Sequence, residues 1–160
     1  MNRVPTVILR AAILAIGAIV LAICVFALPA TWRAVAAEYP THTYVFYIII
    51  LLLYLAAIPF YGALYQGMRL LRYIDSKQAF SQLSVTALKR ISIFATIISG
   101  IFIVSLPFFY IWAQNDDAPG LILFALFLVC APFVIGVFAA VLQRLLQEAL
   151  HIKSENELTV

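Results

Sequence analysis

The sequence predicts an all-α membrane protein with four transmembrane helices, arranged as an up-down antiparallel bundle with both termini in the cytoplasm. Three observations lead to this prediction. The chain is far more apolar than a soluble domain, its apolar residues fall into four blocks of membrane-crossing length, and its basic residues gather at one end of those blocks. We find no internal repeat or linker, so residues 1–160 are expected to form a single domain.

The apolar content excludes an ordinary soluble fold. Hydrophobic residues make up 66% of the 160 residues and charged residues 11%, whereas soluble domains average about 45–50% and about 25%. Asp, Glu, Lys and Arg are absent from residues 11–32, 39–68, 91–115 and 118–143. One helical crossing needs about 20 residues, and strand crossings would need an alternation of polar and apolar residues that these blocks lack. We place the spans at residues 8–29, 44–66, 90–113 and 119–143.

The basic residues predict the orientation. Of the ten Lys and Arg residues, all but Arg33 lie in the N terminus, the loop after the second span or the C-terminal segment. Short cytoplasmic loops of membrane proteins carry such an excess of Lys and Arg. A cleaved signal peptide at the N terminus is the competing interpretation, but the apolar run 11–28 exceeds the about 7–15 residues usual for such segments.

Helices 2, 3 and 4 are expected to extend into the cytoplasm. The second span continues as a helix to Ile74, residues 75–78 form a turn, and Ser81 is the N-cap of a helix that begins at Gln82. The fourth span continues to Lys153, because its apolar residues recur at helical spacing. Residues 144–160 therefore form a cytoplasmic C-terminal helix and acidic tail. On the outer side we expect a loop over residues 30–43 and a tight turn over residues 114–119.

Small residues predict where the spans touch. Helices in lipid associate through close backbone approach rather than hydrophobic burial. We therefore expect four small residues to face neighbouring helices: Ala18, Ala22, Gly100 and Gly136.

The sequence carries no recognisable catalytic, cofactor-binding or metal-binding set. No ionisable residue lies between the headgroup zones, where pumps and ion-coupled transporters keep them, and Arg10 lies close enough to the inner edge of its span to reach the interface. Cys24 and Cys130 each lie within a span, as small packing residues do. Asp75 is expected to be a solvated carboxylate paired with Arg72 or Arg144. We therefore expect a protein that is not an enzyme.

Two runs around the cytoplasmic hairpin are distinctive: YQGMRLLRYIDSKQAFS at residues 65–81 and VTALKRI at residues 85–91, and the chain ends in ENELTV. With these runs the chain resembles, over essentially its whole length, a family of small bacterial membrane proteins known as domain of unknown function 2975. The resemblance implies a four-helix, multi-pass protein of the bacterial cytoplasmic (inner) membrane. Genes of this family often neighbour one for a short helix-turn-helix DNA-binding protein, and the family supplies no catalytic residues.

The first functional hypothesis is a non-enzymatic regulatory protein that binds a soluble partner, such as a helix-turn-helix transcription regulator. The distinctive residues all lie on the cytoplasmic side, and they combine both charge signs with apolar groups. The partners expected are the lipid bilayer and this regulator, with no direct nucleic-acid contact and with homo-oligomers as an open possibility. The candidate binding residues are Arg69, Arg72, Asp75, Lys77, Phe80, Ser81, Glu155, Asn156, Glu157, Leu158, Thr159 and Val160.

The alternative is a small carrier or channel for an apolar or amphiphilic molecule. Its support is the set of prolines inside the last three spans, Pro59, Pro107 and Pro132, because each removes a helix donor. A polar-lined cavity between these spans would favour transport, whereas a tight bundle would favour interaction with a partner.

Overall fold

The structure, a computed structural model, describes residues 3–159. The helices are α1 (Val4–Ala22), the π-helical segment η1 (Ile23–Ala27), α2 (Leu28–Glu38), α3 (Thr43–Asp75), α4 (Gln82–Asn115) and α5 (Gly120–Thr159). Because α1, η1 and α2 follow one another without a break, the described chain has four helices that are long and apolar enough to cross a membrane. The all-helical class and the number of spans are therefore confirmed, and residues 3–159 include no strand.

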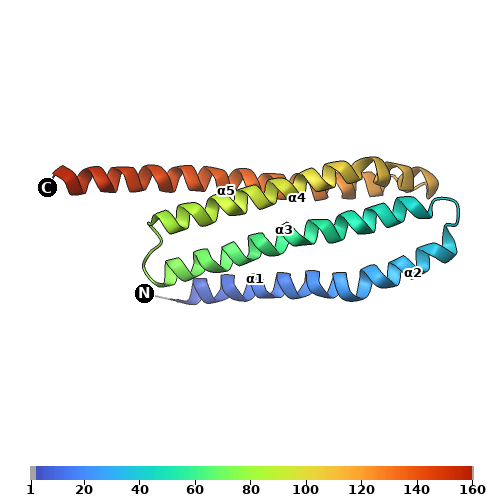
Figure 1. The fold of residues 1–160 in the computed structure, drawn as a ribbon, viewed down its shortest axis with the longest axis horizontal. Coiled ribbons are helices and arrows are strands. Elements are labelled where there is room, and N and C mark those ends of the chain that lie inside the picture. The colour runs from blue at the N-terminus through green and yellow to red at the C-terminus, as the bar shows by residue number, and fades with distance from the viewer. Residues whose placement is uncertain (1–2, 160) are drawn as a thin grey trace.

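The helix α4 holds the bundle together. It packs along both α3 and α5, whereas α1 and α2 pack on α3 (Figure 1). Ser92 contacts Gly136 and Ser99 contacts Val129, so residue numbers rise along α4 as they fall along α5. The neighbouring helices α1 and α3, α3 and α4, and α4 and α5 are each antiparallel (Figure 1). The N and C ends lie at the same end of the bundle, and the red C-terminal part of α5 projects beyond the other helices (Figure 1).

The contact between α4 and α5 depends on small and hydroxyl-bearing residues. A Cβ added to Gly136 would lie 3.3 Å from the Ala95 Cβ and 3.4 Å from the Ser92 carbonyl oxygen. The Ser92 hydroxyl donates to the Gly136 carbonyl at 2.8 Å, and the Ser99 hydroxyl donates to the Val129 carbonyl at 2.9 Å. Close approach thus lets side-chain hydroxyls bond to the backbone of the next helix, and the prediction for Gly136 is confirmed.

The same prediction is wrong for Ala18, Ala22 and Gly100, which are exposed. A Cβ on Gly100 would meet nothing within 4 Å, whereas one on Gly17 would lie 3.3 Å from Leu64 Cδ1 of α3. Successive residues of a helix point about 100° apart. A four-residue spacing of small residues therefore shows that they share a face, but it does not show which face meets a neighbour.

The expected outer loop over residues 30–43 is also wrong, because α2 continues as a helix to Glu38. Pro29 lies in the first turn of α2, where a missing N–H is tolerated. The Leu28 N–H bonds to the Ile23 carbonyl, five residues earlier, so neither Leu28 nor Pro29 donates to the Cys24 carbonyl. The Tyr54 hydroxyl of α3 donates to that carbonyl at 2.7 Å and replaces the lost backbone bond.

A carboxylate ties the two loops at the opposite end from the termini. Asp116 Oδ2 accepts hydrogen bonds from Trp112 Nε1 at 2.8 Å and from the Tyr39 hydroxyl at 3.1 Å. The Phe46 ring packs against both aromatic donors, with centroid distances of 4.9 Å to Tyr39 and 5.0 Å to Trp112. The hydrogen bond to Asp116 raises the pKa of Tyr39, because ionising the phenol would remove its donor.

Replacing Gly136 by leucine should destabilise the bundle, whereas the same change at Gly100 should not. A leucine at position 136 meets Ala95 and the Ser92 carbonyl, and overpacking of this kind costs about 1–3 kcal/mol. Thermal unfolding in detergent measures the difference between the two variants. Equal melting temperatures for Gly136→Leu and Gly100→Leu would contradict the packing described here.

Removing the Tyr54 hydroxyl should cost more than removing the Tyr61 hydroxyl. Tyr61 donates to the Gly17 carbonyl at 2.7 Å, but Gly17 lies inside α1, where a backbone N–H also reaches its carbonyl. Tyr54→Phe leaves the Cys24 carbonyl without its donor, so we expect a loss of about 1–2 kcal/mol and a smaller one for Tyr61→Phe. The same unfolding measurement decides, and a larger loss for Tyr61→Phe would refute this assignment.

Candidate functional site

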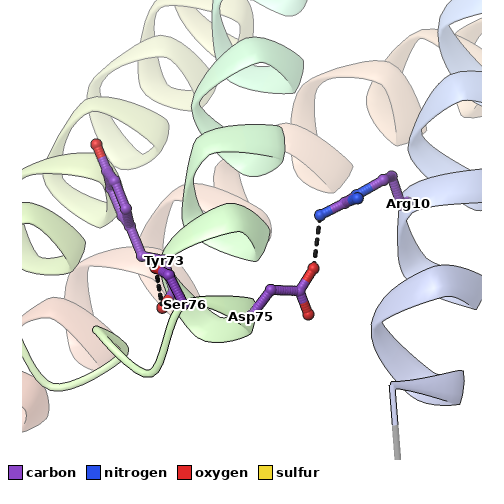
Figure 2. Close-up of polar contacts among 4 residues, drawn as sticks. All are labelled: Arg10, Tyr73, Asp75 and Ser76. Atoms are coloured by element: carbon purple, nitrogen blue, oxygen red, sulfur yellow. Dashed lines mark hydrogen bonds and ion pairs between the residues drawn. The ribbon is translucent and has the colours of Figure 1, made fainter.

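An ion pair joins the first and second spans at the end of the bundle that holds both termini. Arg10 of α1 donates to Asp75 Oδ2, at the end of α3, at 2.7 Å (Figure 2). The expected pairing of Asp75 with Arg72 or Arg144 is therefore wrong. Asp75 lies on the side of α3 that faces α1, and α1 and α3 are antiparallel, so Arg10 and Asp75 reach the same level.

The ion pair borders a cleft with an excess of positive charge. The cleft has a volume of about 380 Å³ and is lined by Arg3, Arg10, Met68, Arg72, Asp75 and Ser76. Three arginines and a single carboxylate line it, and the Nε atom of Arg10 is buried without a hydrogen-bond partner. Guanidinium groups bind phosphate and carboxylate through paired N–H donors. The cleft therefore has the charge and the donors for an anionic group.

The turn after α3 forms where the sequence predicts it. The Gln78 N–H bonds to the Tyr73 carbonyl at 2.7 Å and the Lys77 N–H bonds to the Ile74 carbonyl at 3.3 Å. This arrangement is a Schellman motif, whose central residue adopts a left-handed conformation. Lys77 has a φ of 59°, a conformation usually given to glycine. The motif turns the chain sharply and leaves the Lys77 side chain exposed.

Ser81 begins α4 as predicted, but its hydroxyl does not cap the helix. Its backbone is extended, with φ −143° and ψ 161°, and its Oγ donates to the Gln78 carbonyl at 2.6 Å. This bond stabilises the turn instead of a helix N–H. The neighbouring Phe80 is 65% exposed, so its ring is available to another molecule rather than packed onto the hairpin.

Arg69 is held by aromatic rings rather than by an acid. Its guanidinium carbon lies 5.8 Å from the ring centroids of both Tyr65 and Tyr73. The quadrupole of each ring attracts the cation. This candidate residue is therefore ordered by its own helix.

The acidic tail is helical, which corrects the expectation that the helix ends at Lys153. The helix α5 continues to Thr159, and its residues from 151 onward are all exposed. His151 lies 3.5 Å from Glu155, and the Thr159 hydroxyl donates to the Glu155 carbonyl at 3.0 Å. Glu, Leu and Lys have high helix propensity, so the segment extends the helix into solvent. Val160 lies outside the described residues.

The candidate residues fall on separate parts of the structure. Arg72 and Asp75 line the cleft beside α1, whereas Lys77 and Phe80 lie in the α3–α4 loop. Residues 155–159 form the end of α5, and α5 packs on α4 rather than on α1. The sequence placed Arg3, Arg10 and Ser76 at this end but did not include them among the candidate binding residues, although they line the cleft. The sequence could have indicated this ion pair, because Arg10 near the start of the first span and Asp75 after the second span are expected on the same side of the membrane.

The described residues offer no obvious metal chemistry. Within residues 3–159, no group of three or more His, Cys, Asp or Glu side chains is placed to hold a metal ion. Cys24 and Cys130 are free thiols on η1 and α5.

Comparison with known proteins identifies the family of the chain. The family described as "Protein of unknown function (DUF2975)" matches residues 30–160. A protein of Bacillus subtilis (strain 168) named "Uncharacterized membrane protein YoaS" is 49% identical over 160 residues, which cover 100% of both chains. No solved structure matches the chain. With its four apolar helices, the chain is a membrane protein that belongs to the DUF2975 family, as residues 65–81 and 155–160 predicted.

Proposed function

We propose that this chain is a non-enzymatic regulatory protein of the bacterial cytoplasmic membrane that binds a soluble protein at its cytoplasmic end. The observation that carries the proposal is the length of α5. This helix has 40 residues, whereas a bilayer crossing needs about 20. Its last turns lie beyond the neighbouring helices, and the Leu158 side chain there is 84% exposed. A helix extended into water in this way presents a surface rather than a membrane anchor.

The proposed orientation is an up-down bundle with both termini in the cytoplasm. Its support is electrostatic, because Arg3, Arg10 and Arg72 gather at the end that holds both termini. Arg33 lies in α2, near the opposite end. Positive residues favour the cytoplasmic side of a bacterial membrane, so the hairpin between α3 and α4 and the projecting part of α5 lie inside the cell.

The hairpin and the tail have the chemistry of a protein-binding surface. Phe80 and Leu158 are exposed apolar groups that can act as anchors, and Lys77 and Glu157 supply opposite charges around them. A purely lipid-binding loop would be basic throughout. The gene neighbourhood typical of the resembling family points to a helix-turn-helix transcription regulator as the soluble partner.

The carrier or channel alternative has less support. It requires a polar cavity between the spans that contain Pro59, Pro107 and Pro132. The clefts described on the chain are lined by Arg72 and its neighbours and by Ile152 and its neighbours, at the end that holds the termini. We therefore favour interaction with a partner over transport.

Single cysteines at positions 36 and 78 should test the orientation. Both Ala36 and Gln78 are exposed and lie outside the expected spans, and the native Cys24 and Cys130 are first replaced by alanine. A membrane-impermeant maleimide should label position 36 in intact cells and position 78 only after permeabilisation. The reverse pattern would invert the topology and remove the proposed surface from the cytoplasm.

Loss of the exposed anchors should weaken regulator binding without affecting insertion. We expect Phe80→Ser and Leu158→Ser each to reduce capture of the purified neighbouring regulator about tenfold or more, because anchor residues contribute at least about 1.4 kcal/mol. The control is Thr41→Ala, an exposed change in the loop at the opposite end. If the wild-type chain fails to bind the regulator, or if both anchor variants bind as well as the control, the proposed function is wrong.

A further inference from the structure

One face of α5 carries a seven-residue repeat whose large apolar members are exposed. Its residues recur at alternating spacings of three and four, which are the spacings of positions a and d in a coiled coil. They are Ile135, Phe138, Leu142, Leu145, Ala149, Ile152, Asn156 and Thr159. The side chains of Leu145 and Ile152 are 57% and 63% exposed. We call this set the α5 stripe.

The contact with α4 leaves the α5 stripe uncovered. The face of α5 that meets α4 contains the buried Gly136 and Ala139 and the half-buried Leu146 and Leu150. This face lies one residue further along the helix than the stripe, or about 100° around it. A helix of another molecule can therefore pack on the stripe without displacing α4, because the two contacts use different sides of α5.

Lipid accounts for only part of this exposure. Ile135 and Phe138 lie within the expected fourth span, where apolar side chains can face hydrocarbon. Leu145 and Ile152 lie beyond that span and are exposed, and the last, red part of α5 projects past the other helices (Figure 1). In water these side chains gain by contact with another apolar surface.

A shallow, open depression on the C-terminal part of α5 has the residue arrangement of a coiled-coil hole. It is lined by Ala149, Ile152, Lys153, Asn156 and Glu157. The first four stand at positions i, i+3, i+4 and i+7, and four residues of a facing helix form the hole that receives each a or d side chain. The side chain that matches this hole is a d residue of the same repeat, namely Ile152 of a second copy.

The charges flanking the stripe select a second copy in parallel orientation. Glu148 occupies position g, and Lys153, five residues later, occupies position e. In a parallel dimer each g residue faces the e residue of the other helix, so Glu148 of each copy meets Lys153 of the other. Neither residue forms an ion pair within residues 3–159. An antiparallel pair would oppose like charges instead.

We propose that two copies of this chain associate through the α5 stripe as a parallel two-stranded coiled coil that continues from the membrane into the cytoplasm. Both copies insert with the same topology, so their α5 helices leave the bilayer in the same direction. Confinement to the membrane raises their effective concentration, which compensates for the small number of heptads. Asn156 at position a would meet Asn156 of the second copy and fix the register.

The dimer changes which tail residues remain for a soluble partner. Asn156 and Thr159 become part of the dimer contact, whereas Glu157 and Leu158 stay on its outer surface. The two-fold axis then presents two such tails side by side. This arrangement suits a helix-turn-helix regulator, since such proteins bind DNA as two-fold dimers, but the dimer itself does not depend on the regulator.

Single-cysteine cross-linking tests the register in native membranes. The cysteines at positions 24 and 130 are replaced by alanine, and Ile152→Cys is compared with Ser154→Cys, which is equally solvent-exposed but lies at position f. Mild oxidation should convert the position 152 variant to a disulfide-linked dimer at least tenfold faster, because only the d side chains lie within disulfide reach. Equal rates at the two positions would overturn the proposal.

Charge reversal tests the parallel pairing. Glu148→Lys and Lys153→Glu, each added to the position 152 cysteine variant, should slow cross-linking, because like charges then face each other. The double reversal should restore the original rate. Unchanged rates in the single variants, or no recovery in the double variant, would refute the pairing. The membranes are taken from a strain that lacks the regulator gene, so the outcome is separate from that of the regulator-capture experiment.

Discussion

Within the hydrocarbon core every backbone N–H and C=O must be bonded inside the protein, because lipid offers no partner. This constraint accounts for the long, uninterrupted helices and for their few exceptions. At Pro29 the backbone donor is missing, and the Tyr54 hydroxyl of the next helix bonds to the Cys24 carbonyl. Where α4 meets α5, Ser92 and Ser99 donate to carbonyls of the neighbouring helix. The Tyr54, Ser92 and Ser99 hydroxyls therefore each join one helix to the next.

The four spans do not pack on one another equally. The helix α4 packs along both α3 and α5 over long stretches, whereas α1 packs mainly on α3 and over a shorter stretch. Three kinds of contact hold the first span on α3. They are the close approach at Gly17, the hydrogen bonds from the Tyr54 and Tyr61 hydroxyls, and the Arg10–Asp75 ion pair. The family match begins at residue 30, after α1 and η1.

The end that holds both termini carries the features that a bilayer-spanning bundle does not need. The arginine cleft suits an anionic group, the hairpin presents Phe80 and Lys77, and α5 continues far past its neighbours. These features lie on different elements of one chain. A two-fold pair of chains would double each of them around the α5 axis, and it would place two hairpins and two tails on one surface.

The sequence by itself determined the helical class, the number of crossings, the turn after Asp75 and the start of α4 at Ser81. These features follow from local quantities, namely block length and turn chemistry. It also marked the hairpin and the tail as the distinctive parts. Only the tertiary structure decided that Gly136 and not Gly100 meets a neighbour, that Arg10 and not Arg72 pairs with Asp75, and that the candidate residues separate between the α1 side and the α5 projection. The physical reason is that an apolar helix in lipid is hydrophobic all round, so its sequence does not show which face packs, and the partner of each charge depends on which helices lie side by side.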